Sequence, residues 1–74
     1  MPVTVKVANR VYQMPKTKAE GLLKLASEKV PRGIYAIGKG DYLELHNQPM
    51  SRTRMKETRR SYAAQGYKVY CNGL

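Results

Sequence analysis

Three prolines divide this chain at the points where its hydrophobic period changes, and they constrain the fold more than any other feature. They are Pro15, Pro31 and Pro49. Because proline has no backbone N–H and a fixed φ, it interrupts the interior of a helix or of a central strand. Each segment between these prolines is short and carries its own periodicity. The chain of 74 residues is expected to form one domain over residues 1–74.

The first segment, VTVKVANRVYQM, has the pattern of β-structure. Valines alternate with polar residues in its first half, which predicts a half-buried strand near residues 3–7. The pair Ala8-Asn9 then breaks the alternation. Two interpretations of residues 3–14 are open. One is a hairpin with a two-residue turn in which Asn9 takes a positive φ, and the other is one long bulged strand.

The second segment has a helical period and predicts a helix near residues 18–30. Its apolar residues fall within a stripe about 100° wide. They are Ala19, Leu22, Leu23, Ala26 and Val30. Thr17 followed by Glu20 has the spacing of a capping box at the start, and Pro31 and Gly33 are placed to end the helix.

The rest of the chain predicts two strands, a second helix and a last strand. The stretch GIYAIGKGDYLELH gives β-type runs at 34–37 and 41–46 around a glycine-rich loop. Ser51 is placed to cap a helix over 52–65, and Gly66 to end it in the left-handed conformation. The stretch YKVYC predicts a strand over 67–71.

This order of elements, β(β)αββαβ, predicts an α+β fold. If the extra hairpin is set aside, it is the ferredoxin-like, or split β-α-β, order. We therefore expect a small antiparallel sheet with two helices on one face and the other face open.

The net charge of +9 points to an acidic partner. Residues 1–37 contribute +5 and residues 38–74 contribute +4, so the excess runs along the whole chain. Such a field favours nucleic acid, an anionic membrane or an acidic protein. No stretch approaches the roughly 18 apolar residues of a membrane span, so no membrane is expected as a partner. A single cysteine, Cys71, favours a reducing, cytoplasmic location.

The second predicted helix concentrates this charge. Four of its basic residues fall within about 100° of one another at the helical period. They are Arg52, Lys56, Arg59 and Arg60, while Arg54 lies elsewhere. Like charges four residues apart cost a few tenths of a kcal/mol per pair. The guanidinium fork suits bidentate recognition of phosphate or carboxylate. The stripe is interpreted as a solvated face, as a phosphate-contacting face, or as a docking face for an acidic protein.

The open face of the predicted sheet offers a second candidate surface. Strand alternation places two tyrosines and two lysines there. They are Lys6, Tyr42, Lys68 and Tyr70. RNA-recognition sheets stack bases on such aromatic residues. However, the stretch KGDYLELH has Asp41, Leu43 and His46 where that family has aromatic residues, so only the strand order is shared. The alternative is that the tyrosines are structural.

No motif for catalysis or for a cofactor is expected. The stretch GIYAIGKG has the glycine and lysine spacing of a P-loop, but Gly40 follows Lys39 where the motif needs Ser or Thr. His46 has no second ligand at metal-binding spacing, and Cys71 has the features of a small buried apolar residue. We predict that the chain is not an enzyme.

Three stretches, NRVYQMP, VPRGIYAI and QGYKVYCNG, resemble stretches in small uncharacterised proteins of phages and prophages of Gram-positive bacteria. The resemblance covers most of the chain and implies no activity, cofactor or functional residue. It implies one hypothesis, because small phage proteins often bind and redirect host machinery.

The first functional prediction is nucleic-acid binding of low specificity through backbone phosphates, to DNA or RNA. The alternative is a modulator that docks on an acidic host protein. A third is a structural protein that forms a homodimer.

Overall fold

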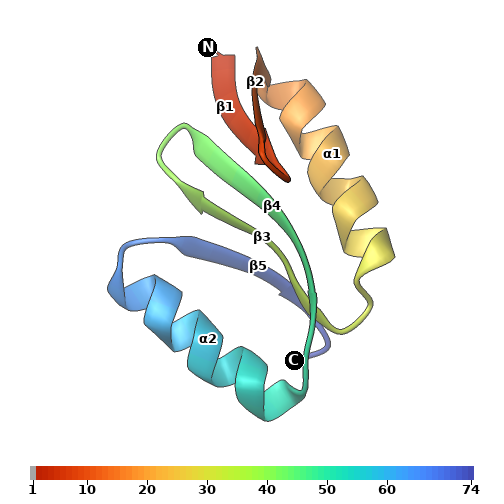
Figure 1. Cartoon of the computed structure of the whole chain (residues 1–74), viewed down its shortest axis with the longest axis vertical. Helices are drawn as coiled ribbons and strands as arrows, with labels where there is room; N and C mark the ends of the chain where they lie inside the picture. The colour runs from red at the N-terminus through yellow and green to blue at the C-terminus, as the bar shows by residue number, and fades with distance from the viewer. Residues whose placement is uncertain (1) are drawn as a thin grey trace.

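Two strands precede the first helix in the computed structural model, which describes residues 2–74 (Figure 1). Strands β1 (Pro2–Val7) and β2 (Arg10–Pro15) pair as an antiparallel hairpin, so of the two interpretations the hairpin is correct. In the turn, Ala8 has a φ of 55°, and Asn9 does not have a positive φ. The prediction for Asn9 is therefore wrong. A positive φ at only the first central residue is the pattern of a type II′ turn, whose twist matches the strands.

The remaining elements agree in type with the predictions. They are α1 (Lys16–Lys29), β3 (Gly33–Lys39), β4 (Tyr42–Pro49), α2 (Arg52–Ala64) and β5 (Lys68–Asn72). The capping box is wrong, because α1 begins directly after Pro15 and has no side-chain cap. Thr17 already lies inside its first turn. At α2, the Ser51 Oγ accepts from the Arg54 N–H at 3.3 Å, and Gly66 has a φ of 88°, as expected.

The five strands form one mixed sheet in the order β2-β1-β4-β3-β5. Three of its pairings are antiparallel, but β1 and β4 are parallel, so the predicted antiparallel sheet is only mostly right. The hairpin is the reason. It reverses the chain before α1, so α1 starts from β2 and not from β1. β2 and β3, which α1 connects, run in one direction, and β1 and β4 run in the other. The ferredoxin-like order is not confirmed.

The two helices cover opposite faces of this sheet, and the prediction that they share one face is wrong (Figure 1). Successive side chains of β4 point to opposite faces. Leu43 packs in a cluster with Ala19 of α1. The ring of His46 points to the other face, and its centroid lies 6.5 Å from the centroid of the Tyr62 ring of α2.

The handedness of the crossovers explains this placement. α1 connects β2 to β3, and α2 connects β4 to β5. Both connections advance in the same direction along the sheet, but β2 and β3 run opposite to β4 and β5. Crossovers between parallel strands are almost always right-handed. Two crossovers of the same hand that start from oppositely directed strands place their helices on opposite faces.

The sheet therefore separates two apolar layers. On the side of α1, the buried residues Val5, Ala19, Ala36 and Leu43 form a cluster. On the other side, α2 lies over β3 and β5 and buries Met55 completely. Asn72 connects β5 to the C-terminal end of α1, because its Nδ2 donates to the carbonyls of Ser27 and Val30, at 3.0 and 3.1 Å.

Candidate functional site

Few side chains attach α2 to the rest of the molecule. Met55 is its only buried residue, while Thr58 and Tyr62 are half-buried. The ring of Tyr62 packs edge-on against that of Tyr67, with centroids 6.0 Å apart. All other side chains of α2 are exposed to solvent. Most of the circumference of α2 is therefore available to a partner.

Five exposed cations lie on α2, including all four residues of the predicted stripe. They are Arg52, Arg54, Lys56, Arg59 and Arg60. Both ion pairs found within residues 2–74 involve Glu44, and neither reaches α2. Glu57, the one acidic residue of α2, is not within the 4.0 Å ion-pair distance of any of them. None of the five cations of this helix is therefore held in an ion pair within residues 2–74.

The cations of α2 also oppose the helix dipole. Its first turn holds no acidic residue and its last turn no basic one, while Arg52 and Arg54 sit at the positive end. A charge of unfavourable sign in a terminal turn costs about 0.3–1 kcal/mol at an exposed site. The C-terminal end is stabilised from the sheet instead, because the Lys39 Nζ donates to the carbonyl of Gln65 at 3.1 Å.

The four residues predicted on an open sheet face do not share one face. Tyr70 packs against the cluster under α1, and Lys68, two residues earlier, points to that same side. Lys6 and Tyr42 point to the face of α2, in register with Glu44 and its neighbours. The sheet therefore has no single surface that combines these side chains, and the predicted stacking platform is wrong.

Each of these two lysines already has a partner. The Lys68 Nζ lies 5.1 Å from the centroid of the Tyr70 ring. The Lys6 Nζ lies 3.5 Å from the Glu44 Oε1. Their charges are less available to a ligand than those of α2.

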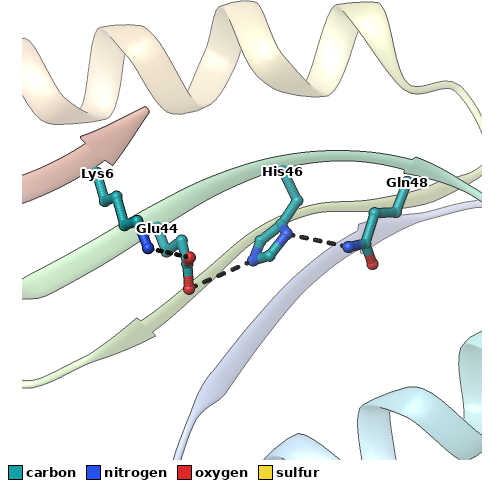
Figure 2. A network of polar contacts seen from close by, with 4 residues as sticks. All are labelled: Lys6, Glu44, His46 and Gln48. Atoms are coloured by element: carbon teal, nitrogen blue, oxygen red, sulfur yellow. Dashed lines mark hydrogen bonds and ion pairs between the residues drawn. The ribbon is translucent and has the colours of Figure 1, made fainter. Parts of the chain in front are cut away.

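A row of polar side chains runs along the sheet beside α2, and Figure 2 shows its contacts. Lys6 comes from β1, and Glu44, His46 and Gln48 come from alternate positions of β4. The Glu44 Oε2 lies 3.5 Å from the His46 Nε2, and the Gln48 Nε2 lies 3.2 Å from the His46 Nδ1.

Which atom donates in the contact between Gln48 and His46 depends on the tautomer of the imidazole. If the amide nitrogen donates to Nδ1, the imidazole proton lies on Nε2, which points toward Glu44. This Nε2 is buried and has no hydrogen bond. Within residues 2–74, no group of three or more His, Cys, Asp or Glu side chains is placed to hold a metal ion. Within this row, Glu44 contacts both Lys6 and His46, so the charge of Lys6 has a partner within the chain.

A hollow of about 300 Å³ lies on the α1 side of the sheet. Three lysines and two acidic residues line it: Lys16, Lys39, Lys68, Glu20 and Asp41. The two acidic side chains leave an excess of one positive charge, so the hollow concentrates less charge than α2 does.

Arg54 and Lys39 extend the basic surface beyond the predicted stripe. Helical periodicity separates Arg54 from the other four cations of α2, and only the burial of Met55 shows that Arg54 is exposed on the opposite flank. The contact of Lys39 with Gln65 spans 26 positions in the chain, so no local pattern predicts it.

No protein-family model matches the chain, and comparison with curated proteins and with solved structures finds no match. No helix within residues 2–74 has the length and apolar character needed to cross a membrane.

Proposed function

We propose that this chain is a non-enzymatic nucleic-acid-binding protein of low sequence specificity, which contacts backbone phosphates through the exposed cations of α2. One observation carries the proposal. Five exposed cations lie on a single helix, and no carboxylate among residues 2–74 pairs with them. Lys and Arg that neutralise phosphates release condensed counterions, which supplies most of the free energy of non-specific binding.

The stability that α2 forgoes supports the same proposal. Arg52–Lys56 and Lys56–Arg60 are like-charged pairs four residues apart, and each costs a few tenths of a kcal/mol. Arg52 and Arg54 also oppose the dipole. Departures from local rules of this kind are expected at functional sites.

Salt-dependent binding of labelled nucleic acid tests this proposal. The affinity of the wild type should fall linearly with salt on a log–log scale, by about 0.9 per phosphate for duplex and about 0.7 for single strands. The double variant Arg59→Gln/Arg60→Gln should lower that slope by up to about two units on duplex and weaken every sequence alike.

The double variant Lys18→Gln/Lys24→Gln is the matched control, because it removes two exposed charges from α1. Its slope should change much less. Equal losses in both double variants would mean that net charge alone, and not α2, drives binding. If the α2 variant binds nucleic acid as well as the wild type at every salt concentration, the proposal is wrong, and an acidic protein surface becomes the better partner for this helix.

A further inference from the structure

The cations of α2 lie on both flanks of the helix. Measured from the buried Met55 at the helical period, Lys56 lies about 100° to one side and Arg54 about 100° to the other. Arg52, Arg59 and Arg60 share the side of Lys56. Directly away from the sheet, the helix presents Thr53, Glu57 and Ala64, all of them exposed. Positive charge therefore borders a central line of mostly small residues.

This arrangement fits a helix that lies between two rows of phosphates. The 13 residues of α2 form a rod about 20 Å long and about 10–12 Å wide with its side chains. The major groove of B-form DNA is about 12 Å wide and 8.5 Å deep, and it admits an α-helix. Because only Met55 is buried, the outer part of α2 can enter such a groove. Each flank then faces the phosphates of one wall.

The aromatic residues argue against single strands as the partner. Proteins that bind single strands stack successive bases on accessible aromatic rings. Beside α2, Tyr62 and Tyr67 are half-buried and pack against each other. The most exposed tyrosine within residues 2–74 is Tyr12, at 44%. It lies on β2, at the opposite edge of the sheet from β5.

We infer that the partner of α2 is double-stranded DNA and that α2 enters its major groove; this inference rests on the proposed nucleic-acid binding. Duplex RNA does not fit, because its major groove is deep and too narrow for side chains to read. Glu57 is consistent with this pose, since it lies on the outward line and faces the base edges. There a carboxylate accepts from the amino group of cytosine.

Two measurements on the full chain test the inference. The first is binding of duplex DNA, of each of its separated strands and of duplex RNA of the same sequence, as a function of salt. The second is dimethyl sulfate reactivity of the duplex at saturating protein. This reagent methylates guanine N7 in the major groove and adenine N3 in the minor groove. We expect the tightest binding to duplex DNA and loss of reactivity at guanine N7 only.

Single variants then distinguish a helix that lies inside a groove from a helix that contacts the DNA on one flank only. Arg54→Gln should lower the duplex salt slope by about 0.9, as much as Lys56→Gln does, because both flanks meet phosphates. The backbone N–H of Arg54 is the group bonded to Ser51, so this cap is kept in the variant. Glu57→Gln should change the preference among base sequences and leave the slope unchanged.

Equal or tighter binding to the single strands, unchanged guanine N7 reactivity, or an unchanged slope in Arg54→Gln would each overturn the groove inference and leave the proposed function standing. Failure to bind any of the three nucleic acids would overturn both.

Discussion

The two helices are nearly equal in length and differ in how they are used. α1 crosses β1, β2, β3 and β4, and α2 contacts β3 and β5. α1 carries four lysines and two glutamates, and α2 carries five basic residues and one glutamate. α1 covers the main core, and its two glutamates partly offset the charge of its four lysines. α2 rests on a narrow contact and presents uncompensated charge. The same sheet therefore supports a structural side and the side for which we propose binding.

Met55→Ala is the variant with the largest expected effect on this comparison. Met55 is fully buried and is the only buried residue of α2, so its loss leaves a cavity under the helix. Truncation of a buried Met to Ala costs about 2–5 kcal/mol. Denaturant unfolding measures this cost, and hydrogen exchange should show that amides of α2 lose protection first.

Leu25→Ala is the matched control on α1. Leu25 is 55% exposed, so its truncation should stay within about 0.5 kcal/mol. A cost for Met55→Ala no larger than that of the control would contradict the narrow attachment of α2.

Asn72→Ala tests the attachment of α1, with an intermediate effect. Its Nδ2 satisfies the carbonyls of Ser27 and Val30 at the end of α1. Without it, partly buried carbonyls lose their donor, which costs about 1–3 kcal/mol. The exposed Asn47→Ala is the control and should be nearly neutral. If the two variants melt at the same temperature, β5 does not hold the end of α1.

The smallest effects concern charge, and they should have opposite signs on the two helices. Arg59→Gln/Arg60→Gln removes the repulsion between Lys56 and Arg60, so stability should hold or rise by a few tenths of a kcal/mol. Lys24→Gln removes the favourable i,i+4 placement of Lys24 after Glu20 on α1, where the two side chains are not within the 4.0 Å ion-pair distance, and should lower stability by no more than a few tenths of a kcal/mol. Urea midpoints resolve the difference. A loss of stability in the α2 variant would show that its arginines have structural partners.

Local signals predicted the elements well, because caps, prolines and glycines act over a few residues. Ser51 and Gly66 lie at the two ends of α2 as expected, and the four basic residues that were predicted to share one side of this helix are exposed. The sheet could not be predicted in the same way. Whether residues 3–14 form a hairpin decides the direction of β1 relative to β4, and the weak turn Ala8-Asn9 left that open.

The wrong assignment of faces follows from the same uncertainty. With two helices on one face, Tyr70 and Lys68 were expected on an open surface. With β5 beside β3 and α2 on the opposite face, Tyr70 instead belongs to the core under α1. The ion pair of Lys6 with Glu44 depends on the parallel register of β1 and β4, which no local pattern encodes.

Backbone NMR during titration with duplex DNA is the most direct test of the central claim, which is that α2 binds the nucleic acid and α1 stabilises the fold. We predict that amide shifts change along Arg52–Ala64 and at Lys39, and that those of Lys16–Lys29 stay in place. The changes should reverse on addition of salt, because phosphate contacts are screened and counterions return. Shift changes concentrated on α1 or on the β1–β2 hairpin, with α2 unaffected, would contradict the account.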